Sequence, residues 1–218
     1  MSSKTNGSPA TAGSQAATAG SHIKGDPFGE SDLLVKIQST CNDIPGIIPA
    51  AKAMSFFGEH AAGWMGVAAV GAIVDKPRRA GWVRMGVSAF SSHAASVIAK
   101  RVVRRPRPHD ERIVIGVGTP SKLSFPSSHA TSTTAALVSL SKLTGSPIPL
   151  LGVPAIMLSR LVLGVHYPTD VSVGAVLGAS TALAVDTVED ATIDKAIAAL
   201  SASAGVLVDR TLESTGNK

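Results

Sequence analysis

The chain has 218 residues, of which 44% are hydrophobic and 16% are charged, with 21 glycines and few aromatic residues. This composition favours closely packed helices in a membrane, where small residues allow helix backbones to approach one another. The formal net charge is +5, but no aromatic interleaving or nucleic-acid motif accompanies the basic residues, so the sequence argues against nucleic-acid binding. The single cysteine, Cys41, excludes an intrachain disulfide and a cysteine-based metal site.

The first 30 residues are expected to form a disordered tail. Residues 1–21 contain sixteen Ser, Ala, Gly or Thr and no hydrophobic run, so they lack the apolar segment of a cleaved signal peptide. Residues 31–57 carry apolar clusters that Pro45 and Pro49 interrupt. This pattern favours broken amphipathic helices that lie at a membrane interface.

Five apolar segments of nearly membrane length follow, and residues 31–186 are therefore predicted to form an all-α, multi-pass membrane helical bundle. Several segments fall short of the usual ~20 apolar residues, but they are rich in Gly, Ala and Ser, and short basic loops separate them. Gly174 and Gly178 fit close packing within the chain better than dimerisation, and a homo-oligomer stays an open alternative. The expected spans are about 60–75, 81–103, 127–143, 147–166 and 169–186.

The C-terminal part, residues 187–218, is expected to hold one more helix and a tail. Apolar residues recur there at alternating steps of four and three, which is typical of an amphipathic helix. Such a helix can pack on the membrane surface or on the bundle. The residues in this pattern are Ile193, Ile197, Leu200, Ala204 and Leu207.

Three motifs between residues 100 and 170 carry candidate chemistry. Three cationic side chains suit an anionic phosphoryl group, two histidines suit a nucleophile and a proton donor, and one carboxylate suits the orientation of a histidine. The motifs read Lys100-x6-Arg107-Pro, then Pro126-Ser-Ser-His129, then Ser159-Arg160-x5-His166-x3-Asp170.

Proline begins a helix well, so Pro126 is expected at the first helical position, with the residues up to His129 in the first turn. The unpaired backbone N–H groups of that turn form an anion site. Pro168 repeats the arrangement: the preceding helix is expected to end near His166, and Asp170 falls in the first turn of the next helix.

The number of spans predicts where the motifs meet. With five spans, the loop at 104–126, the start of the helix at 127 and the turn at 166–169 all emerge on the same face of the membrane. The three motifs are therefore expected to form one site. The basic residues outside the motifs divide evenly between the two faces, so the positive-inside rule leaves the orientation open.

In this order and with these spacings, the motifs resemble the signatures of the type 2 phosphatidic acid phosphatase superfamily. By that resemblance His166 is the nucleophile that forms a phosphohistidine, and Asp170 holds its ring in the attacking tautomer. His129 would protonate the leaving alkoxide and later activate water. The phosphate-binding residues would be Lys100, Arg107, Ser127, Ser128 and Arg160.

The resemblance has two departures and one consequence for cofactors. The gap between His129 and Ser159 is slightly shorter than usual. Ser128 stands where the family motif usually has Gly, which adds a side chain beside the phosphate. The cations supply the charge that a metal supplies in other phosphatases, and no metal-ligand cluster is visible in the sequence. We therefore expect the enzyme to need neither a metal nor another cofactor.

Further runs of sequence narrow the resemblance to a branch of the superfamily that dephosphorylates a polyprenyl-phosphate-linked ribose 5-phosphate. That branch implies a multi-pass enzyme of the plasma membrane whose product supplies arabinose donors for cell-wall arabinan. Glu59, His60 and Tyr167 are weaker candidates for contacts with this substrate. The runs are Phe57-Gly-Glu-His60, the stretch from Ser124 to Ala136, and Gly164-Val-His-Tyr-Pro168.

The three motifs recognise only a phosphate, so other lipid phosphates remain open as substrates. Undecaprenyl diphosphate and phosphatidylglycerophosphate phosphatases are the alternatives within the superfamily. A catalytically silent membrane scaffold or lipid-binding protein is the alternative from another class, although every catalytic group is retained.

Overall fold

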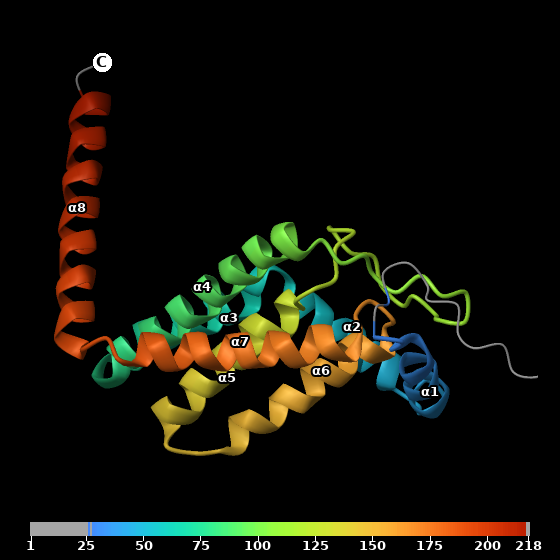
Figure 1. Ribbon diagram of the computed structural model, residues 1–218. Helices are drawn as coiled ribbons and strands as arrows, with labels where there is room; N and C mark the ends of the chain where they lie inside the picture. Colours follow the sequence, from blue (N-terminus) through green and yellow to red (C-terminus); the bar gives the residue numbers. More distant parts are fainter. Residues whose placement is uncertain (1–25, 27, 217–218) are drawn as a thin grey trace, which may run out of the picture.

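A computed structural model of the chain describes residue 26 and residues 28–216, with side chains up to residue 203 (Figure 1). Within these residues every regular element is a helix, apart from one antiparallel bridge between Pro106 and Leu123. The predicted all-α class is therefore confirmed. Most of the tail expected over residues 1–30 lies outside the described residues. The prediction is wrong for its last part, because Asp26 and Glu30 are buried and their carboxylates accept hydrogen bonds from Ser31 and Thr169.

The predicted helical segments are present with small changes of boundary. Two short helices come first, α1 (Ser31–Cys41) and α2 (Ile47–Phe57), and the break between them includes Gly46 with a left-handed φ of 84°. The five longer segments correspond to η1 (Glu59–Ala61) with α3 (Ala62–Val74), α4 (Arg79–Val103), α5 (Ser128–Thr144), η3 (Ile148–Leu151) with α6 (Gly152–Val162), and α7 (Pro168–Asp186). A 3-10 turn, η2 (Lys76–Arg78), joins α3 to α4.

Two predicted boundaries at the motifs are wrong. Pro126 is not the first helical residue of α5, because Ser127 is the N-cap and its hydroxyl accepts a hydrogen bond from the Ala130 N–H. Helix α6 does not extend to the neighbourhood of His166, because it ends at Val162 and Gly164 then takes a left-handed φ of 67°. A side chain at Gly164 would collide with the Val114 carbonyl, so glycine is required at this turn.

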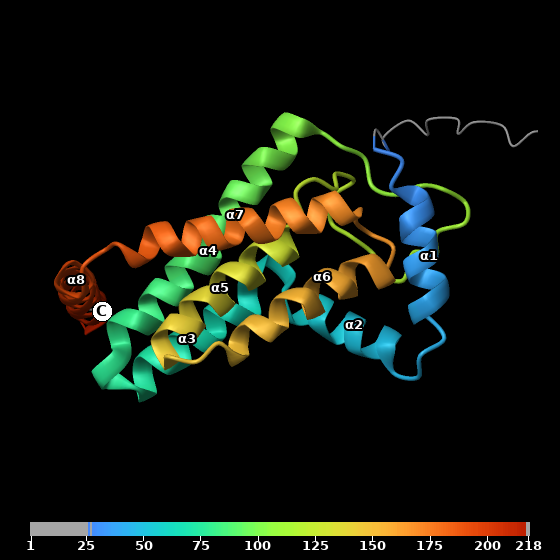
Figure 2. The same cartoon turned by 60° about the horizontal axis from the view of Figure 1, so that its bottom comes forward.

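Helix α5 is the centre of the bundle and packs against α4 and α7 (Figure 2). Small residues allow this close packing. A Cβ atom at Gly174 would lie 2.8 Å from the Ser127 carbonyl oxygen, and one at Gly178 would collide with the backbone of Thr131 and Ala135. The prediction that these two glycines serve packing within the chain is confirmed.

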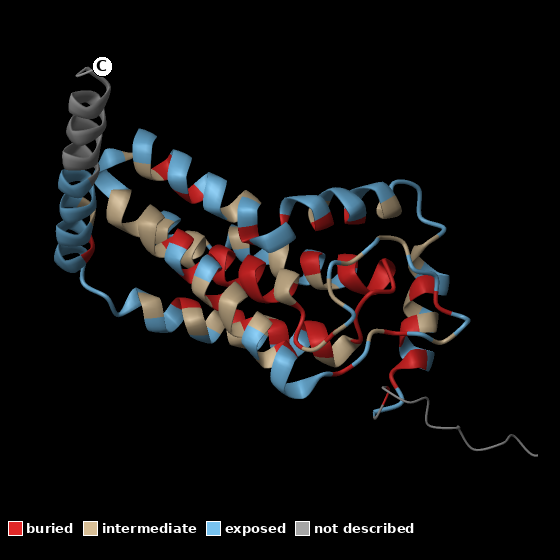
Figure 3. Cartoon of the chain, turned by 90° about the horizontal axis from the view of Figure 1, so that it is seen from above, coloured by how far each residue is buried: buried red, intermediate tan, exposed pale blue. Residues whose placement is uncertain are grey.

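The bundle buries many hydroxyl side chains beside its apolar core and exposes many large apolar side chains. The buried hydroxyl side chains of α4 and α5 include Ser88, Ser92, Ser96 and Thr131. Figure 3 shows exposed residues along the outer faces of the helices. Several of the exposed residues on α4 and α7 are large and apolar, namely Phe90, Ile98, Val102, Val176 and Leu183.

Among the described residues, one helix has the length and apolarity of a membrane span. This helix is α7, with 19 residues. Helix α2 and the segment from Glu59 to Val74 would pass the same test together, with a bend of 50° between them.

The C-terminal part forms the predicted helix, α8 (Asp190–Gly216), which projects away from the bundle (Figure 1). Arg84 of α4 fixes its first turn through an ion pair with Asp190 and a hydrogen bond to the Val188 carbonyl. Of the predicted apolar stripe, Ile193 is buried and Leu200 is 71% exposed. The side chains of Ala204 and Leu207 lie outside the described residues.

We expect Gly178→Ala to lower the stability of the bundle by about 1–3 kcal/mol, the usual cost of overpacking a tight contact. The added methyl group would meet backbone atoms of α5, which cannot move aside as a flexible side chain can. Thermal unfolding in detergent measures the change. Gly66→Ala in α3 is the matched control, because a Cβ atom there meets open space. Equal melting temperatures for the two variants would contradict the packing argument.

Candidate active site

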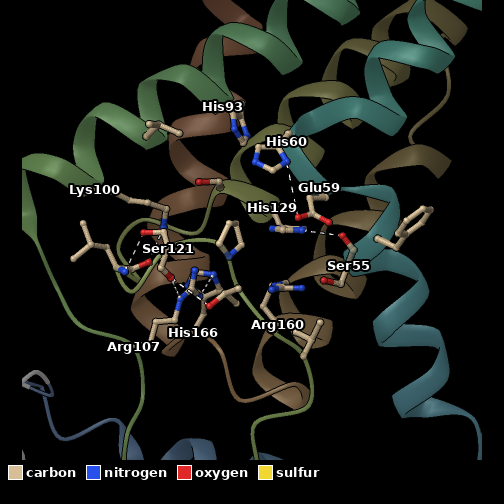
Figure 4. A pocket seen from close by; sticks show the side chains of 18 of the residues that line it. Ser55, Glu59, His60, His93, Lys100, Arg107, Ser121, His129, Arg160 and His166 are labelled. Atoms are coloured by element: carbon tan, nitrogen blue, oxygen red, sulfur yellow. Dashed lines mark hydrogen bonds and ion pairs between the residues drawn. The ribbon is translucent and has the colours of Figure 1, made fainter.

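A cavity of about 370 Å³ opens at one end of the bundle and brings the three motifs together, as the parity of the spans predicts. Residues from α2, η1, α4, α5 and α6 and from the two connecting loops line it. Figure 4 shows how the side chains face one another across the cavity. The predicted site residues that line it are Glu59, His60, Lys100, Arg107, Ser128, His129, Arg160 and His166.

His166 lies in the connection between α6 and α7 and is 2% exposed. Its Nε2 atom is 3.1 Å from Arg107 Nη1, and its Nδ1 atom is 3.5 Å from Asp170 Oδ2. A guanidinium can only donate, so Nε2 must accept and the ring proton belongs on Nδ1, which faces the carboxylate. This tautomer leaves a lone pair on Nε2, as a nucleophile requires.

The surroundings of His166 keep it uncharged. Burial, together with the positive charges of Arg107, Arg160 and Lys100, holds the pKa of His166 well below its ordinary value of 6.5. Burial also lowers the pKa of Arg107, to about 10, which still leaves that guanidinium charged at neutral pH. A neutral imidazole therefore lies beside the charged guanidinium of Arg107.

The three cations of the motifs are held in different ways. Lys100 Nζ donates to the carbonyls of Ser124 at 2.8 Å and Pro126 at 2.6 Å, and so fixes the loop that leads into α5. Arg107 donates to the Ser121 and Val165 carbonyls. Arg160 is 1% exposed, and its Nε and Nη1 atoms have no hydrogen-bond partner within the described part of the chain. A buried guanidinium with unused donors suits an anionic ligand.

The second histidine, His129, is in the first turn of α5. Its Nε2 atom lies 2.9 Å from the Ser55 carbonyl oxygen of α2. A carbonyl can only accept, so Nε2 carries a proton and Nδ1 is the atom that can exchange one. Gly58 makes room for the ring, because a Cβ atom there would be 2.9 Å from His129 Cδ2. The contact between His129 and the Ser55 carbonyl could not be predicted from the motifs, because every residue has a backbone carbonyl.

The serines of the second motif play unequal parts. Ser127 is fully buried and caps α5, and its backbone N–H donates to the Asp170 carbonyl at 2.9 Å, which joins the second motif to the third. Ser128 lines the cavity, and its hydroxyl lies 2.7 Å from that of Ser96 on α4. The added side chain at the usual glycine position is thus held by a neighbouring helix.

Two predicted site residues lie behind the cavity wall. Asp170 is fully buried, and its Oδ2 accepts a hydrogen bond from the Tyr167 N–H at 2.8 Å, so it caps α7 and faces His166 at once. Tyr167 is a correction to the predicted substrate contacts. Its ring is fully buried and lies 4.1 Å from the guanidinium carbon of Arg105, away from the cavity.

Among the described residues, no three His, Cys, Asp or Glu side chains gather as ligands for a metal ion.

The fold and this site define a class of protein. The profile of the PAP2 superfamily matches residues 81–192, and the chain belongs to this superfamily. The crystal structure of Aquifex aeolicus LpxE shares the fold, with a TM-score of 0.58 and 20% identity over 72% of this chain and 94% of that one.

Two curated relatives are more similar in sequence. Decaprenylphosphoryl-5-phosphoribose phosphatase from Mycolicibacterium smegmatis is 55% identical over 148 residues, which cover 68% of this chain and 82% of the relative. The protein of the same name from Mycobacterium tuberculosis is 49% identical over 162 residues, or 74% of this chain and 92% of the relative. The predicted superfamily is confirmed, and the chain is a phosphatase, a hydrolase of phosphoric monoesters.

We expect His166 to stay neutral at pH 6.5 and to carry its proton on Nδ1. Because its pKa in the folded protein lies below 6.5, the imidazolium should form only in more acidic solution. A titration of the ¹⁵N-histidine NMR signals in detergent micelles measures both the midpoint and the tautomer, with the His166 signal assigned by its loss in His166→Asn. A midpoint at or above 6.5, or a proton on Nε2, would contradict the geometry described above.

Proposed function

We propose that the chain is a multi-pass membrane phosphatase that removes the 5-phosphate from decaprenylphosphoryl-5-phosphoribose and leaves decaprenylphosphoryl-ribose. The observation that carries this proposal is the 49–55% identity to two phosphatases named for that substrate. The matched stretches of 148 and 162 residues are longer than the segment from Lys100 to Asp170 that holds the motifs. The likeness therefore extends beyond the residues that recognise a phosphate in every member of the superfamily.

The apolar outer surface of the bundle supports a membrane location. Large apolar side chains such as Phe90, Val102 and Val176 are more than 60% exposed, while many serines and threonines are buried. Lipid suits such a surface and water does not. We assign the spans to α3, α4, α5, η3 with α6, and α7 in the plasma membrane, with α8 outside the catalytic domain. The domain predicted over residues 31–186 extends to Asp26 and Glu30, whose carboxylates pair with Arg105.

In the first proposed step, Nε2 of His166 attacks the phosphorus atom. A P–N bond forms while the bond from phosphorus to the ribose 5-oxygen breaks. His129 must enter this step as an imidazolium, with a proton on each ring nitrogen, and it gives the Nδ1 proton to the departing alkoxide. Arg107, Arg160 and Lys100 stabilise the charge on the phosphoryl oxygens. Asp170 stabilises the positive charge that develops on the His166 ring.

In the second step, water hydrolyses the phosphohistidine. His129, now neutral, takes a proton from the water as its oxygen bonds to phosphorus, and the P–N bond breaks. Inorganic phosphate leaves, and His166 returns to its neutral form. Neither step calls for a metal ion, because Lys100, Arg107 and Arg160 provide the positive charge, and no cofactor is expected.

The outer part of the cavity is proposed to hold the ribose and its phosphodiester. A volume of about 370 Å³ is within the range of small-molecule sites and leaves room beyond one phosphate. Glu59 and His60 line this part. His93 of α4 also lines the cavity, and its ring centroid is 6.0 Å from that of His60. His60 and Ala61 both have left-handed φ angles, of 52° and 60°, and strain of this kind at non-glycine residues gathers at ligand sites.

A panel of purified lipids in detergent tests the proposal. We expect decaprenylphosphoryl-5-phosphoribose to give the highest kcat/KM for phosphate release, above undecaprenyl diphosphate, phosphatidylglycerophosphate and phosphatidate. Free ribose 5-phosphate should be poor, because the tail contributes affinity at about 0.8 kcal/mol per buried CH₂ in the aliphatic case.

Controls separate substrate choice from activity itself. His166→Ala should abolish phosphate release from every lipid, and release by the wild type should persist in excess EDTA. If the kcat/KM of another lipid is tenfold higher, which corresponds to about 1.4 kcal/mol in transition-state binding, the substrate assignment is wrong. The phosphatase activity itself is not affected by that result. If no lipid phosphate is hydrolysed, the proposal as a whole is wrong.

A further inference from the structure

A buried ionic cluster lies directly behind His166, on the side away from the cavity. It consists of Asp26, Glu30, Arg105 and Asp170, all of them less than 10% exposed. Arg105 is the cation that joins the three carboxylates. Its Nη1 atom is 3.0 Å from Asp170 Oδ1, and its Nη2 atom is 2.7 Å from Glu30 Oε2 and 3.8 Å from Asp26 Oδ1.

Glu30 also holds the start of α7, the helix that carries Asp170. Its Oε1 atom accepts a hydrogen bond from the Thr169 N–H at 2.7 Å, and its Oε2 atom accepts one from the Thr169 hydroxyl at 2.6 Å. Asp26 in turn holds the segment that carries Glu30, by accepting from the backbone N–H groups of Glu30 and Ser31. A residue before the first helix therefore reaches the turn that presents the catalytic carboxylate.

Aromatic rings fix the plane of the Arg105 guanidinium. The ring centroid of Tyr167 is 4.1 Å from the guanidinium carbon, and that of Phe28 is 5.6 Å from it. A guanidinium held by rings and by two carboxylates has little freedom to rotate. Its two N–H arms therefore set the position of Asp170 Oδ1 relative to Glu30.

Both oxygens of Asp170 are fixed by this arrangement. Arg105 binds Oδ1, and the Tyr167 N–H binds Oδ2, the oxygen that lies 3.5 Å from His166 Nδ1. Burying an ionic cluster is costly, and apolar residues of similar size often stabilise a fold as well or better. Packing alone therefore does not explain why charged residues lie at this place. A role in holding Asp170 does explain it.

We propose that Glu30 and Arg105 are positioning residues of the phosphatase, which hold the Asp170 carboxylate against His166 Nδ1 and so keep Nε2 as the attacking nitrogen. This inference rests on the proposed function, because it concerns the nucleophile of that reaction. Neither residue belongs to the three motifs. The segment before α1 is then part of the catalytic apparatus.

Glu30→Gln is the direct test, because the amide keeps the size of the side chain and removes its charge. We expect kcat on the lipid phosphomonoester to fall about 10–100-fold with KM nearly unchanged, since small misplacements of catalytic groups cost rates of this order. Arg105→Lys, which keeps the charge but not the two-armed geometry, should give a fall of similar size. It also serves as the second test if Glu30→Gln does not fold.

The matched control is Asp32→Asn. Asp32 pairs with Arg112 at 2.7 Å and so also joins α1 to the loop after α4, but this pair is exposed and does not touch Asp170. The control should retain wild-type kcat. Equal losses in Asp32→Asn and Glu30→Gln would show that the cluster only fastens α1, and would overturn the inference.

A double-mutant cycle separates positioning from general stability. If Glu30 acts through Asp170, Glu30→Gln should lower kcat no further in the Asp170→Asn background. If the fall in kcat of the double variant equals the product of the two single falls, the inference is wrong. It is also wrong if the kcat of Glu30→Gln lies within twofold of the wild-type value. A wild-type protein that hydrolyses no lipid phosphomonoester would instead refute the proposed function.

Discussion

Three cations around one neutral histidine, two of them buried, are the constraint on which the rest of the structure depends. Lys100, Arg107 and Arg160 repel one another, and burial strengthens that repulsion because water cannot screen it. Backbone carbonyls of two loops offset part of the cost for Lys100 and Arg107. Arg160 keeps two buried donors without a partner in the described residues, so the site is incomplete until an anion enters. A phosphoryl group supplies the missing charge.

The packing of the helices follows from the need to bring these groups together. Gly174 and Gly178 let α7 approach α5 closely enough for the Ser127 N–H to reach the Asp170 carbonyl. That contact joins the turn that carries His129 to the turn that carries Asp170. A larger residue at either glycine would separate the two histidines of the site. The small-residue composition of the chain is thus tied to its chemistry as well as to its helix packing.

Much of the fold could be predicted from the sequence, because apolar length and Pro and Gly punctuation determine where helices begin and end. The meeting of the three motifs followed from the number of spans. The two helix boundaries that were predicted wrongly depend on which nearby residue caps or ends the helix. Pro126 was expected to be the first helical residue, but Ser127 takes the N-cap position and α5 begins at Ser128. Gly164 ends the α6 segment early by adopting a left-handed conformation.

The residues that the sequence could not reveal act across long separations in the chain. Glu30 and Arg105 are 75 residues apart, and neither stands in a motif or a periodic pattern. Tyr167 follows His166 in the chain, yet its ring lies against Arg105 and not in the cavity. The Ser55 carbonyl that orients His129 belongs to the backbone, which no side-chain pattern can report.

The central claim is that His166 becomes covalently phosphorylated during turnover, and trapping that intermediate tests it most directly. His129→Ala should slow the hydrolysis of the phosphohistidine, because no group then activates water. Rapid quenching of this variant with base, which preserves phosphohistidine, followed by mass spectrometry of the peptides, should place the phosphate on His166. A phosphate on another residue, or turnover by the wild type with no phosphoenzyme at any time under single-turnover conditions, would contradict the claim.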